Sequence, residues 1–204
     1  SLFTTFPFGL PTWEMIIIFA FWEIRKFKVG RILSILVESV IISPSKGTFK
    51  SNLNNIFLLL RLDLNVPLDG GKITDTTRID KIIPTLKFLI TQNAKIIIIS
   101  HVGRPKGKVV NELSLKPICE DLIKKLNQNI KLISENINEI NSEVLLKLSG
   151  KEIVMLENIR FYPEEEENNE KFAKHLASLA DIYVNDAFSC SHRAHASIHN
   201  ITNF

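Results

Sequence analysis

The chain has 204 residues, of which 45% are hydrophobic and 23% charged, and its formal net charge is +3. This length is enough for one well-buried domain, alone or with an extension. The small net charge does not indicate a nucleic-acid partner, and Cys119 and Cys190 give no disulfide framework, which fits a reducing compartment.

Residues 1–50 form an apolar leader that we leave unassigned, and we place the functional domain at residues 51–204. Met15–Trp22 and Ile32–Ile42 are apolar runs, but neither reaches the roughly 20 residues of a membrane-spanning helix. Basic residues follow the first run, whereas a secretory signal would place them before it. We expect no membrane partner, and a membrane-associated leader or a stretch unrelated to the domain remain alternatives.

From about residue 55 onward, apolar strands alternate with amphipathic helices. We expect strands at 56–64, 95–100, 130–133, 152–156 and 181–184, and helices at 79–90, 115–126, 142–148 and 163–180. Pro84 predicts a kink or a split in the first helix, and Ser114 is the expected N-cap of the second. Continuous Ile, Val and Leu in the strands indicate a parallel sheet with helices on both faces. The predicted fold is a doubly wound, Rossmann-like α/β domain.

Unusual polar residues follow the ends of the expected strands, which is where ligands bind in open α/β sheets. They are Asp63, Asn65, His101, Arg104, Arg160 and Arg193, with Arg78 at the start of the first helix. Grouped cations repel one another unless carboxylates or a bound anion offset the repulsion. Because arginine forms two parallel hydrogen bonds to carboxylate or phosphate, the sequence predicts a cationic pocket for a small, highly anionic metabolite.

Each of these residues also has a simpler interpretation. A single Arg after a strand is commonly a solvated surface group, Asp63 could pair with a neighbouring Arg, and Asn65 could be a turn residue. We interpret Glu164–Glu167 as a solvated first helical turn, and we predict no metal site. The combination favours the pocket, because independent surface arginines would not all follow strand ends. The chain contains no nucleic-acid module, no G-x-x-x-x-G-K-S/T loop and no G-x-G-x-x-G loop.

Six segments resemble motifs of the N-terminal domain of the phosphoglycerate kinase family, and they occur in that family's order. They are RLDLNVP at 61–67, TDTTRI at 74–79, SHVGRPKG at 100–107, LENIRF at 156–161, YVNDAF at 183–188 and HRAHAS at 192–197. The resemblance covers about residues 55–204. It implies one of two doubly wound domains, the one that binds 3-phosphoglycerate, while the other domain binds Mg-ATP.

The resemblance also implies a substrate site made of Asp63, Leu64, Asn65, Arg78, His101, Val102, Gly103, Arg104, Arg160 and Arg193. His101 and the last three arginines would hold the phosphate, and Asp63 and Asn65 would orient the hydroxyl and carboxylate end. Arg78 would be the catalytic residue, because it would face the transferring phosphoryl group. The attacking substrate carboxylate is already ionised at pH 7, so catalysis would depend on positioning and charge stabilisation.

The chain departs from the family pattern in three places. Leu64 stands where the family more often has Phe, Ser189-Cys190-Ser191 replaces a Gly-Thr-Ala type stretch, and the chain stops at Phe204, before the hinge and the C-terminal domain. We therefore expect Mg²⁺ with ATP or ADP to bind the missing domain and no cofactor to be held by this chain.

The expected function is the substrate-binding half of a glycolytic phosphoglycerate kinase. The parent reaction converts ATP and 3-phosphoglycerate into ADP and 1,3-bisphosphoglycerate. We expect a cytoplasmic monomer that is inactive as this isolated chain. The alternatives are a non-catalytic truncated relic, a half-enzyme that recruits a separately encoded C-terminal domain, and a small-anion-binding module without kinase activity.

Overall fold

The computed structural model describes residues 35–36, 56–141, 145 and 153–204. The apolar leader therefore lies outside the described residues except for β1 (Ile35–Leu36), and so does most of the helix expected at 142–148. No helix in the described part of the chain combines the length and the hydropathy needed to cross a bilayer.

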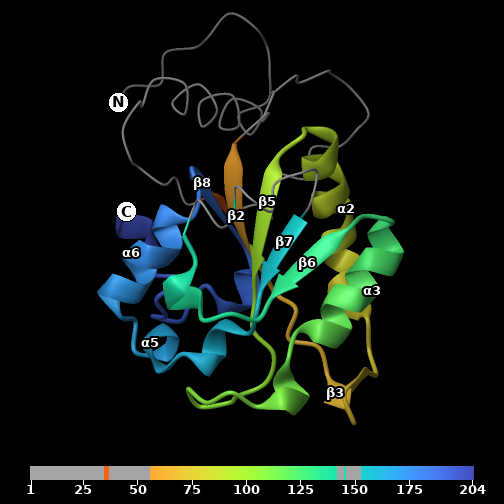
Figure 1. Cartoon of the computed structure of the whole chain (residues 1–204), viewed down its shortest axis with the longest axis horizontal. Helices are drawn as coiled ribbons and strands as arrows, with labels where there is room; N and C mark the ends of the chain where they lie inside the picture. The colour runs from red at the N-terminus through yellow and green to blue at the C-terminus, as the bar shows by residue number, and fades with distance from the viewer. Residues whose placement is uncertain (1–34, 37–55, 142–144, 146–152) are drawn as a thin grey trace, which may run out of the picture. The chain divides into compact units, whose positions relative to one another are not determined.

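A parallel sheet forms the centre of the domain, with strand order β1-β8-β2-β5-β7-β6 (Figure 1). The strands that follow β1 are β2 (Phe57–Leu62), β5 (Lys95–Ile99), β6 (Ile130–Ile133), β7 (Ile153–Leu156) and β8 (Ile182–Asp186). In the register, Leu59 of β2 pairs with Ile97 of β5 on one side and with Tyr183 of β8 on the other. All four residues of β7 are buried, as expected for a strand covered on both faces.

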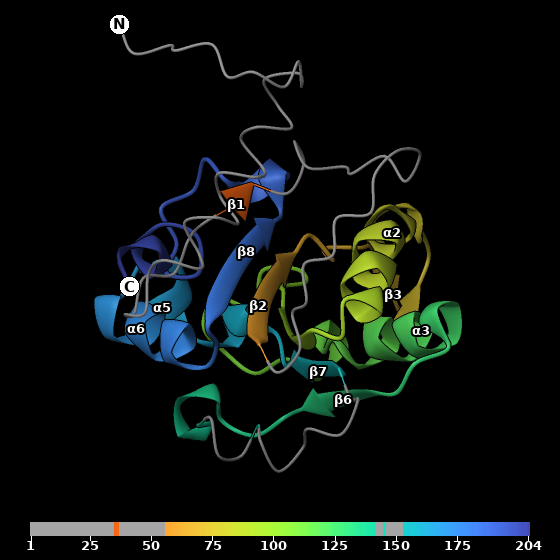
Figure 2. The same cartoon turned by 90° about the horizontal axis from the view of Figure 1, so that it is seen from above.

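Helices cover both faces of this sheet (Figure 2), which confirms the predicted doubly wound α/β fold. One face carries α2 (Thr77–Thr91) and α3 (Lys116–Leu126), and the other carries α5 (Pro163–Glu166) and α6 (Glu170–Ser178). A small antiparallel hairpin, β3 (Leu68–Asp69) and β4 (Lys72–Ile73), follows β2. Its turn residues Gly70 and Gly71 have positive φ, which glycine adopts without steric cost.

Short 3₁₀ turns occupy several connections. They are η2 (Asn111–Leu113), η3 (Ile137–Glu139), η4 (Ile159–Phe161), η5 (Phe188–Cys190) and η6 (Asn200–Asn203). In η4, the Asn158 side chain accepts a hydrogen bond from the backbone N–H of Arg160. An N-cap of this kind satisfies a donor that the turn itself leaves open, and here it fixes the backbone at Arg160.

Two local expectations are wrong, and a third is wrong in part. Of the kink or split expected at Pro84, the split does not occur, because helix α2 continues from Thr77 to Thr91. Its buried stripe, which includes Ile79 and Leu86, offsets the hydrogen bond that proline cannot donate. The single helix expected after Pro163 is two helices, and the Asn169 side chain caps the second.

Ser114 is also not the N-cap of α3, since Leu115 holds that position. Its hydroxyl accepts from the backbone N–H of Lys116 at 3.1 Å and donates to Glu157 at 2.7 Å. Glu157 further accepts from the backbone N–H of Leu115. A carboxylate at the end of β7 therefore satisfies the start of α3, which ties the two elements together.

The core on the α6 side of the sheet is made of large buried side chains. Phe172 and Leu176 of α6 pack with Leu59, Ile97 and Tyr183 of the strands. Full burial of such a side chain contributes roughly 1.5–3 kcal/mol. This packing fixes the strand ends and therefore the positions of the polar residues that follow them.

Candidate functional site

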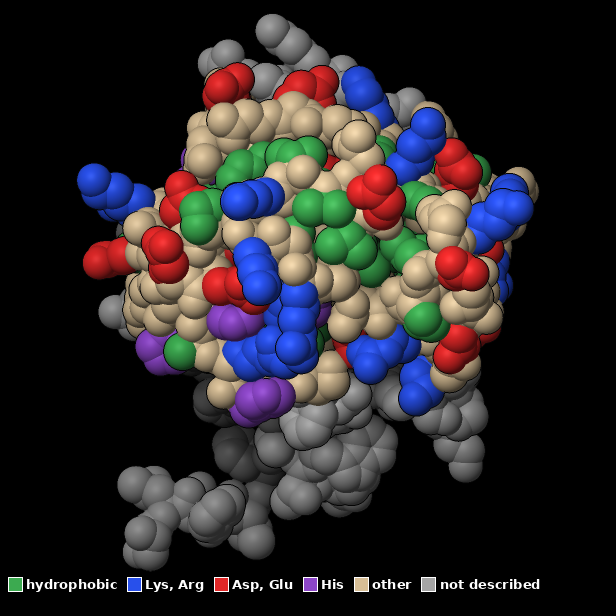
Figure 3. Space-filling model, turned by 90° about the horizontal axis from the view of Figure 1, so that it is seen from below, with side chains coloured by type: hydrophobic (Ala, Val, Ile, Leu, Met, Phe, Trp, Pro, Cys, Tyr) green, Lys and Arg blue, Asp and Glu red, His purple; other side chains and the backbone are tan. Residues whose placement is uncertain are grey.

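The carboxyl ends of the strands lie along the lower edge of the sheet in Figure 1. Seen from below, Lys, Arg and His side chains gather in one patch, with Asp and Glu side chains beside them (Figure 3). This edge is where ligands bind in open parallel sheets. The strand-end residues form a buried group and an exposed group here, and the two differ in how their charges are satisfied.

The more buried group comprises Arg61, His101, Arg160, Arg193 and His195, which we call the inner cluster. Its first three members are buried, and Arg193 and His195 are half-buried. The charges of the other four members all lie close enough to affect the His101 ring. His101 is only 2% exposed, and its buried Nδ1 has no hydrogen-bond partner among the described residues. Burial, and then the charges of these neighbours, lower the pKa of His101 to about 2. His101 is therefore neutral at pH 7, and a ring nitrogen remains available.

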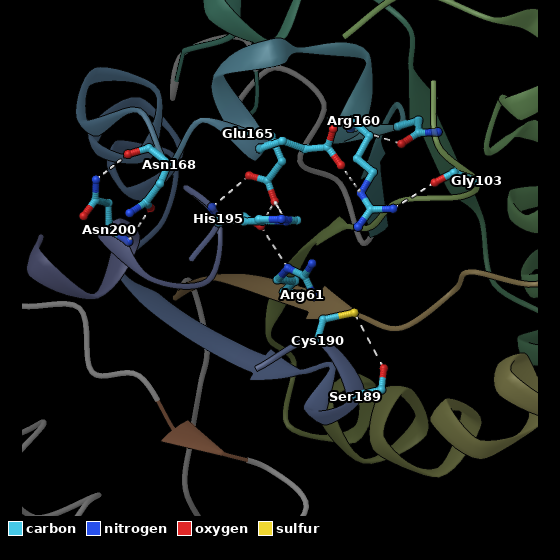
Figure 4. Close-up of polar contacts among 12 residues, drawn as sticks. Arg61, Gly103, Arg160, Glu165, Asn168, Ser189, Cys190, His195 and Asn200 are labelled. Carbon is cyan, nitrogen blue, oxygen red and sulfur yellow. Dashed lines mark hydrogen bonds and ion pairs between the residues drawn. The ribbon is translucent and has the colours of Figure 1, made fainter. Parts of the chain in front are cut away.

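Arg160 is the most constrained arginine of the inner cluster. Its side chain is 3% exposed, its Nη1 donates to the carbonyl of Gly103 at 2.9 Å (Figure 4), and its Nε lies 3.5 Å from Glu166 Oε1. Burial lowers the pKa of Arg160, and the charge of Glu166 opposes that shift, but a guanidinium stays charged in either case. The remaining nitrogen, Nη2, is buried and has no partner in the described part of the chain.

A second buried side chain, Asn158, fixes the loop around Arg160. It is 0% exposed, and its Nδ2 donates to the carbonyls of Val102 at 2.8 Å and Leu113 at 2.9 Å. Its Oδ1 accepts from the Arg160 backbone N–H at 3.1 Å. Both amide hydrogens donate and the amide oxygen accepts, so the loop after β5 and the turn after β7 are held as one unit.

Asn65 links the loop after β2 to the same unit. Its Oδ1 accepts from the backbone N–H of Gly103 at 2.9 Å. Gly103 has a φ of +65°, and a Cβ there would lie 2.6 Å from the Leu113 side chain. Only glycine fits this position without strain. Asn65, Gly103 and Arg160 thus form a continuous chain of contacts across the ends of three strands.

Arg61, a member of the inner cluster, and Glu165 beside it have positions that the sequence did not indicate. Arg61 points from β2 into the domain and is 1% exposed; its Nε donates to Ser197 Oγ at 2.9 Å, whereas its buried Nη1 has no partner among the described residues. Glu165 is 0% exposed, so the expectation that Glu164–Glu167 is wholly solvated is wrong. Burial raises the pKa of Glu165, and the charge of Arg61 and two hydrogen bonds from Ser197 oppose that shift.

One signal in the sequence could have found Arg61. It is a charged residue inside an otherwise apolar run, IFLLLRLDL, and a charge that a buried strand carries must be paired or must face a site. Glu165 gave no such signal, because four consecutive glutamates do not show which of them faces inward.

The exposed group is the rim pair, which we define as Asp63 and Arg78. Arg78 in the first turn of α2 donates to Asp63, and the two side chains are 45% and 16% exposed. Asp63 also accepts from Ser189 Oγ at 2.6 Å. Beside Ser189, Cys190 lies near enough to Arg160 to affect its pKa. The simpler interpretation of Asp63, a pairing with a neighbouring Arg, therefore describes this geometry.

The other expected site residues are placed differently. Arg104 is exposed, and its side chain makes no hydrogen bond or ion pair with the residues that the structure describes. Leu64 is 0% and Val102 is 2% exposed, so their side chains belong to the core. The structure thus brings together His101, Arg160 and Arg193, and it holds Arg78 in a separate pair.

The described residues on this edge do not form a metal-binding group. Within residues 56–141 and 153–204, no three His, Cys, Asp or Glu side chains gather as a possible metal-binding group. The carboxylates of the site are already engaged by Arg61, Arg78, Arg160 and Ser197.

Comparison with known proteins identifies the family of this chain. The sequence pattern of the family described as "Phosphoglycerate kinase" matches residues 50–204. The chain is 53% identical over 151 residues to the phosphoglycerate kinase of Wolbachia pipientis subsp. Culex pipiens (strain wPip), which covers 74% of this chain and 38% of that protein. It is 45% identical over 161 residues to that of Moorella thermoacetica, covering 78% of this chain and 41% of the relative.

Solved structures give the same result. The structure of phosphoglycerate kinase from Coxiella burnetii superposes with a TM-score of 0.66 at 41% identity, over 74% of this chain and 37% of that one. The phosphoglycerate kinase of Pyrococcus horikoshii OT3 gives a TM-score of 0.64 at 32% identity, over 74% and 38%. The chain spans somewhat more than a third of the length of these relatives. From the matched residues and the shared fold together, the chain belongs to the phosphoglycerate kinase family.

Proposed function

We propose that residues 51–204 form the 3-phosphoglycerate-binding domain of a phosphoglycerate kinase and that the inner cluster receives the substrate phosphate. The observation that carries this proposal is a pair of buried guanidinium nitrogens, Arg160 Nη2 and Arg61 Nη1, that have no partner among the described residues. A buried donor without a partner costs about 1–3 kcal/mol, and a phosphate oxygen would remove that cost.

The balance of charge supports an anion as the ligand of the inner cluster. Arg61, Arg160 and Arg193 all act on the His101 ring, and Glu165 and Glu166 are the carboxylates described beside them. Three guanidinium groups therefore face two carboxylates and a neutral histidine. A phosphate would reverse the remaining excess of positive charge and would accept hydrogen bonds in the geometry that arginine favours.

The proposed roles follow from position. Arg160, Arg193 and His101 hold the phosphate, and Arg104, which is exposed at the loop after β5, closes on it from the solvent side. Asn65 keeps its Nδ2 for the hydroxyl and carboxylate end, since its Oδ1 is bonded to Gly103. Asp63 orients the same end. Leu64, Val102 and Gly103 contribute backbone only.

Arg78 has the proposed catalytic role at the rim. In this structure it pairs with Asp63, so it would have to turn from that carboxylate toward the transferring phosphoryl group. An exposed ion pair contributes only about 0–1 kcal/mol, so the exchange costs little. No general base is needed, because the attacking carboxylate is already ionised at pH 7.

The whole reaction would also require Mg-ATP, which we propose binds outside the residues described. The proposal includes a monomeric, cytoplasmic protein of glycolysis. For the 204-residue chain by itself we expect substrate binding without turnover, because its sequence contains neither glycine-rich nucleotide loop.

Calorimetric titration of the chain with 3-phosphoglycerate tests the proposal. We expect binding that weakens as salt rises, with glycerate, which lacks the phosphate, binding far more weakly. Glycerol 3-phosphate, which lacks the carboxylate, should retain part of the affinity. Absence of salt-sensitive binding would contradict the substrate assignment, and turnover by the purified chain with Mg-ATP would contradict the expectation of a half-enzyme.

A further inference from the structure

The buried carboxylate of Glu165 has no role in the proposed binding of the ligand, yet it is the centre of a hydrogen-bond network. Glu165 and His195 lie next to each other, with Arg61 close by (Figure 4). Glu165 is 0% exposed, and burying an ionisable group is costly unless it is paired and hydrogen-bonded. The hydrogen bonds around Glu165 therefore indicate a role for this carboxylate in addition to packing.

The donors and acceptors in the network have fixed directions. Arg61 Nε can only donate, so Ser197 Oγ accepts from it at 2.9 Å. The single hydroxyl hydrogen of Ser197 then donates to Glu165 Oε1 at 2.6 Å, and the Ser197 backbone N–H donates to Oε2 at 2.8 Å. Both carboxyl oxygens accept, which is the pattern of an ionised carboxylate. Ser197 thus connects that carboxylate to the Arg61 guanidinium.

Glu165 also holds the segment that carries Arg193. Its backbone carbonyl accepts from the Ala196 N–H at 2.9 Å, and its Oε1 lies 3.8 Å from His195 Nδ1. Three successive residues of the HRAHAS segment are therefore fixed against one residue of α5. On the next residue of α5, Glu166 pairs with Arg160. Two neighbouring glutamates thus hold two guanidinium groups, Glu166 that of Arg160 directly and Glu165 that of Arg61 through Ser197.

We propose that Glu165 and Ser197 are positioning residues for 3-phosphoglycerate binding, and that they hold Arg61 and the Arg193 segment in place before the ligand arrives. The inference rests on the proposed function. Arg61 is held at Nε, which leaves Nη1 without a protein partner. A guanidinium that is fixed on one edge loses less conformational freedom when an anion binds the other edge.

Substitution of Glu165 by Gln tests the carboxylate with little change in shape. A Gln amide can accept through only one of its two terminal atoms, so one Ser197 donor would face another donor. Ser197→Ala tests the connection differently, because it keeps the Glu165 charge and removes the hydroxyl. The matched controls are Glu167→Gln, which removes the same charge from an exposed position, and Ser178→Ala, which removes an exposed hydroxyl.

The affinity for 3-phosphoglycerate is the first readout. We expect Glu165→Gln and Ser197→Ala each to weaken binding about tenfold or more, and the two controls to stay within about twofold. Wild-type protein that fails to bind would overturn the proposed function itself. Wild-type binding together with unchanged affinity in folded Glu165→Gln and Ser197→Ala proteins would overturn only the positioning role.

The second readout is made on wild-type protein and does not depend on whether the Glu165 and Ser197 variants fold. In an NMR spectrum of ¹⁵N-labelled arginine side chains, with the signal assigned by its loss in Arg61→Lys, the Arg61 Nε–H should exchange slowly with water before any ligand is added. The Nε–H of exposed Arg104 should exchange fast. Equally fast exchange of the two would overturn the proposal, because Arg61 would not be held in advance.

Discussion

The inner cluster and the rim pair lie on the same edge of the sheet, yet they satisfy their charges in opposite ways. In the inner cluster, Arg160 is 3% exposed and keeps a buried nitrogen without a partner. In the rim pair, Arg78 is 45% exposed and is already bound to Asp63. If the proposed function holds, the inner cluster is arranged for a ligand in advance, whereas the rim pair must rearrange before it can take one.

The largest effect should come from Arg160→Gln. Removing one partner of a buried, hydrogen-bonded charge pair costs about 3–5 kcal/mol, so we expect affinity for 3-phosphoglycerate to fall at least about a hundredfold. Lys131→Gln, an exposed lysine on β6, is the control for loss of one positive charge. Equal affinities of the two variants in a calorimetric titration would contradict the role given to the inner cluster.

His101 should make the folded state sensitive to acid. Its folded-state pKa of about 2 lies below the ordinary value of 6.5, so its stabilising contribution is complete above pH 6.5 and is lost as the pH falls. From about pH 6 downward this group should cost about 1.4 kcal/mol of unfolding free energy per pH unit.

Denaturant unfolding of wild type and His101→Gln between pH 7 and pH 5 measures this contribution. The variant should have the shallower dependence on pH. His192→Gln, at an exposed position, should keep the wild-type dependence. Parallel curves for wild type and His101→Gln would show that His101 is not held neutral by its surroundings.

Gly103→Ala should destabilise the loop that carries the Arg160 contact. The new Cβ would lie 2.6 Å from Leu113, in addition to the strain of a positive φ. Gly71→Ala is a matched control, because φ is also positive there and nothing lies within 4 Å of the added Cβ. We expect Gly103→Ala to lose about 1 kcal/mol more unfolding free energy than Gly71→Ala, and only the former to weaken anion binding. If thermal melts show the same loss of stability for both variants, the Cβ at residue 103 does not clash with Leu113.

The smallest effect should come from the rim. Since Arg78 is exposed and its pairing with Asp63 is worth about 0–1 kcal/mol, Arg78→Gln should change stability by less than about 1 kcal/mol and 3-phosphoglycerate affinity by less than about threefold. A loss of affinity as large as that of Arg160→Gln would contradict the difference proposed between the inner cluster and the rim pair.

The sequence was enough to predict the parallel sheet and to predict that the polar residues after its strands lie close together. Continuous apolar runs imply a parallel sheet, and parallel strands place their carboxyl ends on one edge, so His101, Arg160 and Arg193 had to be neighbours. The sequence could not indicate which glutamate of Glu164–Glu167 turns inward, because that depends on how α5 meets the chain at Ser197. It also could not decide between a pairing of Arg78 with Asp63 and an orientation toward a ligand, since both are local choices of side-chain rotamer.

The most direct test of the account is a crystal structure of the chain with 3-phosphoglycerate bound. The account predicts a phosphate oxygen at about 3 Å from Arg160 Nη2, with Arg193 and His101 around the same phosphate and the Arg61 contact to Ser197 unchanged. A phosphate bound at Arg78 alone, with Arg160 Nη2 still unpaired, would contradict it.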